Sequence, residues 1–464
     1  MIWTRIKSSP LVLILVLAIT VRLAVLIALP SVFAFEKTGV YQGIRDYDTY
    51  AQHVLQTGVY GAMPGKPDAL IPPLYAYSLA TLYAIFGRGS FQLGCFQILL
   101  DCLSIVLLYQ IGKRIMPLGR PVALLACFLY AVYPYLIFQN LTITDTPIFM
   151  LLLYAFMLAV VLLREQQNFN RRTLALSILG GLLLGVGSLS RAVIAPFALF
   201  VGIWFLFRLS FWQTLIRLLP VAVVSILVLI PWTVRNYNLY GAFVAVTTNA
   251  GGNFWIGNSP YTVPFFKAGY HTHWVGALPA SVNGLNDFQK NSKQQELGIA
   301  YLRENPYKIP ELLWVKFLAY WSIDVFPTRQ PTAELIENYA GLPTLNNDSQ
   351  GNVVVAGVPL NDPSTVYSQP LFDQIGRGIH SLYFGGLLIL ALVGIVMTRR
   401  FWRDVSLLWF IQISMTLVYV IIVPATRYRA PTDPLLFLFS SYTLVVAYYY
   451  LSRKQSLTSA IPSP

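Results

Sequence analysis

The chain has 464 residues, of which 56% are hydrophobic, 14% aromatic and only 11% charged. Soluble proteins carry roughly 25% charged residues, so this composition excludes a soluble enzyme and predicts a polytopic membrane protein. The 32 Lys and Arg and the 19 Asp and Glu residues give a formal net charge of +13. On a soluble protein this excess would indicate nucleic-acid binding, but in a membrane protein its meaning depends on where the charges lie.

Ten apolar runs have about the length that a helix needs to cross a bilayer, roughly 20 residues. We expect spans at residues 10–29, 91–112, 121–138, 147–163, 173–190, 193–208, 215–233, 379–397, 404–422 and 433–451. Residues 71–87 are also apolar, but this segment opens with two prolines, is rich in tyrosine and ends on Phe86-Gly87. We expect it to form a helix at the membrane interface, because an eleventh span would spoil the charge pattern of the loops.

The Lys and Arg residues of the short loops predict which side of the membrane each loop faces. With the N-terminus in the cytoplasm, the cytoplasmic loops hold fifteen basic residues and two acids, Glu165 and Asp404. The basic residues are Arg5, Lys7, Lys113, Arg114, Arg120, Arg164, Arg171, Arg172, Arg208, Arg217, Arg399, Arg400, Arg403, Arg453 and Lys454. The rest of the chain holds 17 basic and 17 acidic residues. We therefore expect both termini in the cytoplasm and no nucleic-acid partner, since topology accounts for the net charge.

These spans and loops divide the chain into three parts. Residues 1–235 form a membrane core whose first extracytoplasmic loop, residues 30–90, carries acidic residues. Residues 236–378 form an extracytoplasmic loop region, in which aromatic residues among charges predict an interfacial helix over 305–326. Residues 379–464 hold the last spans and a short cytoplasmic tail. The expected fold class is an all-α polytopic membrane protein with about ten transmembrane helices.

Acidic residues stand at two places on the predicted outer side, where charge is costly and tends to serve function. Asp46 and Asp48 follow the first span. On a turn, their carboxylates can converge on a metal ion or a hydroxyl, and desolvation raises a carboxyl pKa in a way that suits a general base. The alternative is that they cap a helix over 49–57. Asp145 precedes the fourth span and either caps that helix or belongs to a site.

Arginines on the same predicted side are candidates for binding a phosphate. Arg191 lies in an outer turn and Arg235 at the outer end of a span, where a snorkelling side chain is the alternative. Arg427 and Arg429 lie in a proline-bounded outer turn and break the charge rule that holds elsewhere. Arg22 lies within the first span and needs a partner, for which we expect a carboxylate of the first loop.

The sequence offers little support for a metal or nucleotide site. Two of the four histidines, His271 and His273, lie close together without a third ligand nearby, and the three cysteines lie inside apolar runs. No phosphate-binding glycine-rich motif is present, which argues against nucleotide-driven chemistry.

One series of motifs extends over residues 1–260 and the last outer turn. An acid is followed by tyrosine four residues later, at Asp46 and Tyr50, and Asp145 stands in a later outer turn. The other segments are Gly-Val-Tyr-Gly at 58–61, Pro-Pro-Leu-Tyr at 72–75, Pro-Trp-x-x-Arg-Asn at 231–236 and Arg-Tyr-Arg-x-Pro at 427–431. In order and sidedness this series resembles the GT-C fold glycosyltransferases that use polyprenyl-phosphate sugars, specifically the protein-mannosyltransferase and aminoarabinose-transferase-like superfamily.

The resemblance implies that an acid of the first outer loop is the general base of an inverting transfer. Asp46 matches by its spacing to Tyr50, but relatives often have Asp-Glu there whereas this chain has Asp48 one place further on, so either is the expected base. Asp145 matches the second acid, which supports the site or binds a divalent cation, Mg²⁺ or Mn²⁺, in some relatives. The expected ligands of the lipid phosphate are Arg191, Arg235, Arg427 and Arg429.

The expected donor is a polyprenyl-phosphate-linked sugar, and the expected acceptor is a hydroxyl of a protein, lipid or glycan. The expected location is the inner membrane of a bacterium, with the active site on the extracytoplasmic side. Two other classes remain open. A lipid or solute transporter would place charges near the membrane midplane and show repeats, neither of which is seen. An O-antigen polymerase or ligase would share the spans and outer arginines, but the first-loop acid argues against it.

Overall fold

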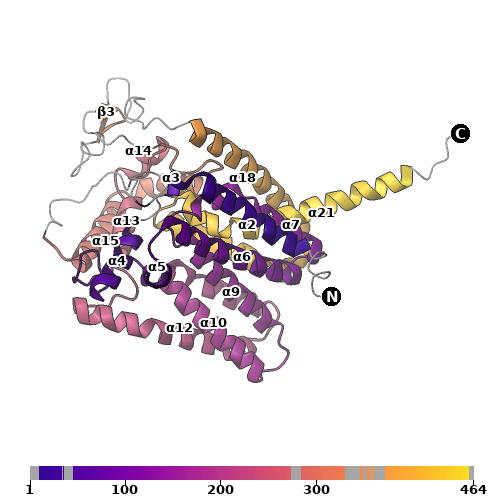
Figure 1. The fold of residues 1–464 in the computed structure, drawn as a ribbon, viewed down its shortest axis with the longest axis horizontal. Helices are drawn as coiled ribbons and strands as arrows, with labels where there is room; N and C mark the ends of the chain where they lie inside the picture. Colours follow the sequence, from indigo (N-terminus) through magenta and orange to yellow (C-terminus); the bar gives the residue numbers. More distant parts are fainter. Residues whose placement is uncertain are drawn as a thin grey trace.

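The computed structural model describes residues 10–33, 35, 45–272, 284–329, 345–347, 353–355, 358–359 and 371–458. Long helices pack side by side in a bundle (Figure 1), and the shorter helices α4 (Arg45–Thr57), α13 (Ala250–Gly257) and α15 (Asp287–Glu304) gather at one end of it, on the left in that view. The described chain begins and ends at the opposite end of the bundle, where α2 starts and α21 projects outward.

The long helices are apolar along most of their length. They are α2 (Pro10–Ala28), α6 (Ser90–Ile115), α9 (Thr146–Arg164), α10 (Arg171–Ser190), α12 (Phe211–Tyr240), α18 (Leu371–Met397), α19 (Trp402–Ile421) and α21 (Asp433–Thr458). They fall into seven stretches long and apolar enough to cross a membrane, with α18 and α19 counted as one stretch. The chain is therefore an integral membrane protein, and the prediction of an all-α polytopic fold is confirmed.

Each of the ten predicted spans falls on helix, but two of them are interrupted. The span predicted at 121–138 is divided into α7 (Arg120–Ala131) and α8 (Pro134–Gln139), because Pro134 cannot continue a helix. The span predicted at 193–208 is divided into a short 3₁₀ turn and α11 (Phe197–Leu206). The number of membrane crossings thus stays a prediction.

The apolar segment at 71–87 forms α5 (Pro73–Phe86), a helix of 14 residues. At 1.5 Å per residue it is about 21 Å long, shorter than the roughly 30 Å of a bilayer core. It packs against α4, and Tyr75, Ala76 and Leu79 are fully buried. These features agree with a helix that does not cross the membrane.

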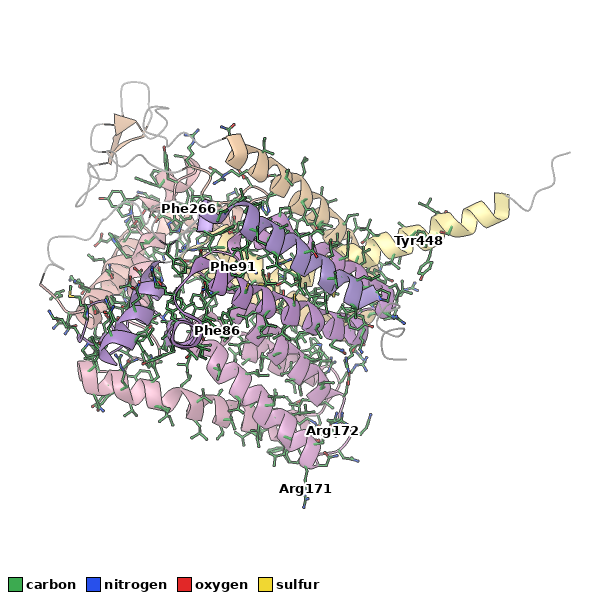
Figure 2. All side chains as sticks on the ribbon, viewed as in Figure 1. Phe86, Phe91, Arg171, Arg172, Phe266 and Tyr448 are labelled. Carbon is green, nitrogen blue, oxygen red and sulfur yellow. The ribbon has the colours of Figure 1, made fainter. Side chains whose placement is uncertain are left out.

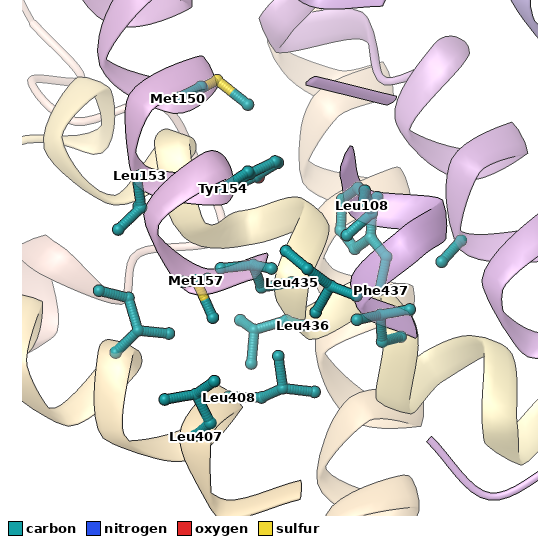
Figure 3. Packing of buried hydrophobic residues seen from close by; sticks show 14 of the residues in the cluster. Leu108, Met150, Leu153, Tyr154, Met157, Leu407, Leu408, Leu435, Leu436 and Phe437 are labelled. Atoms are coloured by element: carbon teal, nitrogen blue, oxygen red, sulfur yellow. The ribbon is translucent and has the colours of Figure 1, made fainter. Parts of the chain in front are cut away.

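The core of the bundle lies between α9, α19 and α21, with α6 and α7 completing it. Leu153 and Met157 of α9, Leu408 of α19 and Leu435 of α21 are buried in one hydrophobic cluster, and Figure 3 shows Met157 next to Leu435. Residues on the outer side of the bundle are apolar but exposed, for example Ile226, Leu227 and Ile230 on α12, as expected for a surface that faces lipid.

Glycines allow α10 and α12 to approach closely. A Cβ added at Gly181 would lie 2.7 Å from the Val221 carbonyl oxygen, and one at Gly185 would lie 2.9 Å from that of Ser225. Small residues at this spacing bring helix backbones together in membrane bundles.

Arg22 of α2 has a partner, but it is not the first-loop carboxylate that the sequence led us to expect. Its Nε donates to Asp101 Oδ2 of α6 at 2.7 Å, and its Nη1 donates to the Ala131 carbonyl at 2.8 Å. Asp101 also accepts from the Tyr130 hydroxyl and from Asn140 Nδ2. That expectation was wrong because α2 packs directly on α6, so a residue 79 positions away in sequence is the nearest acid.

Within residues 305–326 the structure has the helix α16 (Ile309–Tyr320), which exposes Trp314 and part of Phe317. Its predicted position at the membrane interface stays a prediction. Its buried Lys316 fastens it to the bundle, since Nζ donates to the carbonyls of Gly257 and Ile421 at 3.0 and 2.9 Å and to Asn258 Oδ1 at 3.0 Å. The remaining helices outside the bundle are α3 (Pro30–Phe33), α14 (Thr262–Lys267) and the short α20 (Thr426–Arg429).

Three short strands, which the sequence did not predict, form a small antiparallel sheet in the order β1 (Leu345–Asn347), β2 (Val353–Val355), β3 (Val358–Pro359). Leu345 pairs with Val355, which also pairs with Val358. The limits of the three predicted parts of the chain stay predictions.

Candidate active site

The two first-loop aspartates lie in the first turn of α4, which begins at Arg45. The helix predicted over 49–57 therefore starts four residues earlier, and both carboxylates lie within it rather than before it. Asp46 is exposed and makes no hydrogen bond or ion pair with any residue that the structure describes. Desolvation by the surrounding protein raises the pKa of its carboxyl above the ordinary 3.8. An unpaired carboxylate with a raised pKa is suited to accept a proton.

Asp48, by contrast, is buried and its oxygens are occupied. Arg88 Nη2 donates to Oδ2 at 2.7 Å and Arg88 Nε to Oδ1 at 3.0 Å, which is the two-pronged geometry of a strong ion pair. The Tyr83 hydroxyl donates to Oδ1 and Gln52 Nε2 to Oδ2, both at 2.9 Å. Asp48 thus ties α4 to the end of α5 and to the residues that follow it.

Tyr47, between the two aspartates, connects α4 to the second predicted acid. Its ring is buried and meets the Tyr75 ring edge to face at 5.0 Å between centroids. Burial raises the pKa of the Tyr47 hydroxyl well above its ordinary value, and the Asp145 carboxylate raises it further, whereas the Arg191 guanidinium lowers it. The charges of Asp145 and Arg191 therefore lie within electrostatic range of the first turn of α4.

Asp145 and Arg191 form one buried ion pair. Arg191 Nε donates to Oδ2 at 2.7 Å and Nη2 donates to Oδ1 at 2.6 Å and to Thr146 Oγ1 at 2.9 Å. The Asp145 side chain does not cap α9, so the capping alternative is wrong for its carboxylate. Arg191 Nη1 is buried and its N–H bonds have no acceptor among the described residues.

Arg427 lies at the exposed end of an aromatic stack beside this pair. Its Nη2 donates to the Tyr428 hydroxyl at 2.8 Å, and its guanidinium carbon lies 4.8 Å from the centre of that ring. Tyr428 stacks on Tyr419 at 4.6 Å, and Tyr419 is within electrostatic range of Asp145, Arg191 and Arg427. Arg427 has no acidic partner among the residues that the structure describes, so its positive charge is not neutralised.

Arg429 of the same turn is fully buried and does not fit the predicted role in phosphate binding. Its Nε donates to Asp433 Oδ1 at 3.1 Å and its Nη1 to the Ser322 carbonyl at 2.6 Å. Its guanidinium also covers the Phe384 ring at 3.7 Å. The Tyr133 hydroxyl donates to the other Asp433 oxygen at 2.9 Å. Arg429 therefore holds the turn between α19 and α21 in place.

Arg235 of α12 is half-buried and fastens the first outer loop to the bundle. Its Nη1 donates to the Asp68 carbonyl at 2.6 Å and its Nη2 to the Tyr60 carbonyl at 3.0 Å. The Asp68 carboxylate in turn accepts from the Tyr50 hydroxyl and from the Ala62 amide, both at 2.6 Å. This arrangement positions the loop that follows α4, and it gives Arg235 a role other than the predicted phosphate contact.

The described residues do not fit a metal ion held by the protein alone, since no group of three His, Cys, Asp or Glu side chains is found among them. Both oxygens of Asp145 are bound by Arg191, and both oxygens of Asp48 accept hydrogen bonds. His271 is buried among aromatic rings, and His273 lies outside the described residues. We therefore derive no step through a divalent cation.

Sequence reasoning missed four residues that shape this region: Tyr47, Arg88, Asp68 and Tyr428. The only sequence signal for Arg88 was its position directly after the Phe86-Gly87 stop, and that for Tyr428 was its place between two unexplained arginines. Tyr47 and Asp68 carried no signal that set them apart.

Comparison with known proteins identifies the fold. Residues 71–234 match the sequence profile of the family described as dolichyl-phosphate-mannose-protein mannosyltransferase. The structure is similar to the archaeal oligosaccharyltransferase AglB from Archaeoglobus fulgidus, solved in complex with an inhibitory peptide and a dolichol-phosphate. The TM-score is 0.54 at 15% identity, over 99% of this chain and 52% of that one. The chain has the GT-C fold.

A second structure of the A. fulgidus enzyme, in complex with Zn and sulfate, gives a TM-score of 0.53 at 14% identity over 96% of this chain and 49% of that one. The chain thus spans about half the length of the oligosaccharyltransferase. ArnT from Cupriavidus metallidurans bound to undecaprenyl phosphate also matches, at 14% identity over 92% of this chain and 77% of that one. Its TM-score of 0.39 adds nothing to the fold assignment. The comparison with curated protein sequences gives no significant match.

Proposed function

We propose that the protein is a membrane glycosyltransferase that moves a sugar from a polyprenyl-phosphate-linked donor to a hydroxyl acceptor. The observation that carries this proposal is the pairing of charges around Asp145 and Arg191. Among the candidates, Asp46 is the carboxylate without a partner in the described residues. Arg235 and Arg427 are the arginines without an acidic partner there, but Arg235 donates to the Asp68 and Tyr60 carbonyls, whereas Arg427 donates only to the Tyr428 hydroxyl. The site thus combines one free base with one free cation.

Asp46 is proposed as the general base. The acceptor hydroxyl loses its proton to the Asp46 carboxylate as its oxygen forms a bond to C1 of the sugar. The bond between C1 and the phosphate oxygen breaks, its electron pair stays on the phosphate, and the configuration at C1 inverts. We propose Asp46 rather than Asp48 for this role because the oxygens of Asp48 already accept hydrogen bonds from Arg88, Tyr83 and Gln52. Proton acceptance by a positioned side chain contributes about 10²- to 10⁴-fold to such rates.

Arg427 is proposed to bind the phosphate of the donor. Negative charge develops on this phosphate as the sugar leaves, and a preformed cation stabilises the transition state most where charge develops. The stack of Tyr428 on Tyr419 holds the guanidinium in place and limits the side-chain entropy that binding would cost. The free Nη1 of Arg191 supplies a second donor on the same side.

The relatives support the donor class. The matched family is described by a dolichyl-phosphate-linked mannose, and the oligosaccharyltransferase of similar fold was solved with a dolichol-phosphate. We further propose, from the Lys and Arg distribution, that the site faces outward from the inner membrane of a bacterium and that both termini are cytoplasmic. The acceptor is a hydroxyl compound whose identity is left open.

Proteoliposomes that contain the purified protein and a radiolabelled polyprenyl-phosphate sugar test this proposal against the transporter alternative. We expect the label to move covalently onto a hydroxyl acceptor from an envelope extract, with release of the polyprenyl phosphate, and we expect D46N to abolish the transfer. Label that crosses the bilayer still attached to the polyprenyl phosphate, equally in wild type and D46N, would contradict the proposal.

A further inference from the structure

A second group of charged side chains lies at the other end of the helices that carry the candidate active site. Asp145 precedes α9 and Arg164 ends it, so this helix of 19 residues separates the two by about 28 Å. Likewise, Arg191 precedes the helical segment that contains α11, and Arg208 follows it. The second group is therefore on the opposite face of the bundle, the face where Figure 2 shows Arg171 and Arg172 projecting from the start of α10.

A pocket of about 200 Å³ lies at this face between α6, α9, α11 and α19. Its apolar lining comes from Ile115, Val161 and Trp204, and its charged lining from Arg114, Arg164, Glu165, Arg208 and Asp404.

The charges of this pocket do not cancel, because three arginines face two carboxylates. Arg208 is hydrogen-bonded to Asp404. Arg114 Nε lies 3.8 Å from Glu165 Oε1, and Arg164 Nη1 lies 3.7 Å from Asp404 Oδ1. These two distances are too long for hydrogen bonds. One positive charge thus remains, and the arginine N–H groups are only partly used by the acids.

Arg164 is the buried member of the group, with only 5% of its side chain exposed. Its guanidinium lies 3.7 Å from the centre of the Trp204 ring, and its Nη2 donates to the Arg403 carbonyl at 2.9 Å. Its Nε is buried and has no acceptor among the described residues. A buried N–H group without an acceptor costs free energy, so an oxyanion that enters the pocket would satisfy it.

Arginines at helix C-termini also offset the helix dipole, and Arg114 and Arg164 occupy such positions. That role needs neither a shared pocket nor an unpartnered Nε.

The surroundings favour a lipid as the source of the oxyanion. Ile203 and Leu206, on either side of Trp204 in α11, and Trp402, close to Asp404, are exposed apolar side chains along which acyl chains can lie.

We infer that this pocket binds the phosphodiester headgroup of an anionic phospholipid of the membrane leaflet on this face. A phosphodiester carries one negative charge, which matches the one unbalanced positive charge of the pocket. Basic pockets between transmembrane helices on the cytoplasmic side are suited to anionic headgroups. The inference takes the cytoplasmic orientation of this face from the proposed topology, but it does not depend on the proposed glycosyl transfer, since it concerns other residues on the opposite face.

Retention of phosphatidylglycerol relative to phosphatidylcholine by the purified full-length protein, measured by native mass spectrometry, tests this inference. The variant R114Q/R208Q removes two pocket charges but leaves the buried Arg164 in place. The control R399Q/R400Q removes two exposed arginines from the same face that do not line the pocket. We expect the pocket variant to lower preferential retention about 25-fold, since each of the two basic residues changes binding to an anionic membrane about fivefold, and the control to leave it unchanged.

Equal loss in both double variants would contradict a defined pocket, because it would indicate a general surface potential. Equal retention of the two lipids by the wild type would also contradict the inference. A thermal unfolding midpoint that inorganic phosphate raises as much as phosphatidylglycerol does would overturn the lipid assignment in favour of free phosphate. If R114Q/R208Q does not fold, the single variant R208Q carries the test, because Arg208 is half-exposed and at the rim.

Discussion

The first turn of α4 and the turn at α20 show the same arrangement with opposite charge. Each has two like charges two residues apart, Asp46 with Asp48 and Arg427 with Arg429. In each pair one charge is buried in an ion pair, Asp48 with Arg88 40 positions away and Arg429 with Asp433 four positions away. The other charge of each pair is exposed without an ionic partner among the described residues. In a helical turn, residues two apart point to different sides, so one can hold the fold while the other faces a ligand.

This comparison assigns stability to one residue of each pair and activity to the other. The buried members, Asp48 and Arg429, fix where the turn lies, and the exposed members, Asp46 and Arg427, are those for which we propose a role in the transfer. The predictions below test that separation, beginning with the largest expected effect.

Arg429→Gln should have the largest effect on folding. It leaves the Asp433 carboxylate buried without its cation, and removal of one partner of a buried ion pair costs about 3–5 kcal/mol. We expect a strongly lowered thermal unfolding midpoint or loss of folded protein in detergent, with Arg399→Gln on the exposed surface as the control. An unchanged midpoint for R429Q would show that the buried Arg429 does not stabilise the turn, contrary to the comparison.

Arg427→Gln should leave the unfolding midpoint unchanged and weaken donor binding. A charge-assisted hydrogen bond to phosphate contributes about 1.5–3 kcal/mol, so we expect KM for the polyprenyl-phosphate sugar to rise by about 10- to 100-fold. Arg427→Lys should recover part of this loss, since it keeps the charge. Kinetics of R427Q that match the wild type would show that another residue binds the phosphate.

Asp48→Asn should lower stability moderately and leave activity per folded molecule largely intact. It weakens the contacts of the buried Asp48 with Tyr83, Gln52 and the partly exposed Arg88, at a cost of about 1–3 kcal/mol. Arg88→Gln, which removes the other half of the ion pair, should behave in the same way. The measurement is chemical or thermal unfolding together with transfer activity normalised to folded protein.

The pH dependence of transfer should show the raised pKa of Asp46. The base works in its charged form, so kcat/KM should fall as pH decreases through a pKa that lies above the ordinary aspartate value of 3.8. The reason for the sign is that desolvation favours the neutral form and moves the loss of activity to higher pH. A profile that stays flat down to the ordinary value would argue against Asp46 as the base.

Removal of divalent cations by a chelator should have the smallest effect on transfer activity. Because Arg191 occupies both Asp145 oxygens, we expect transfer to proceed unchanged after treatment with EDTA, and added Mg²⁺ or Mn²⁺ to give no increase. Activity that disappears with EDTA and returns with Mn²⁺ would show that the Asp145–Arg191 pair opens to admit a cation.

The long helices of the fold could be predicted from the sequence, because the length of each apolar run was enough to identify them. Each predicted span falls on helix, and the short α5 was separated from the spans by its prolines and tyrosines. The breaks near Pro134 and before α11 were missed, because an apolar run has the same composition whether or not its helix is interrupted. The small sheet after α16 carried no periodic signal long enough to detect.

The sequence was enough to name residues of the candidate site, but not to predict how they pair. The sequence named Asp46, Asp48, Asp145 and Arg191, but their pairing depends on residues far away in the chain. Arg191 is 46 positions from Asp145, and Arg88 is 40 from Asp48. Since a single sequence contains no information on such contacts, the proposal of Asp46 rather than Asp48 rests on the ion pair of Asp48 with Arg88.

The measurement that tests the central claim most directly is the single-turnover rate of sugar transfer per folded molecule in D46N and D48N, side by side. The account predicts that D46N folds like the wild type and loses about 10²- to 10⁴-fold in rate, whereas D48N loses stability but keeps a rate within a few-fold of the wild type. A D46N rate equal to that of the wild type, or the larger loss in folded D48N, would contradict it.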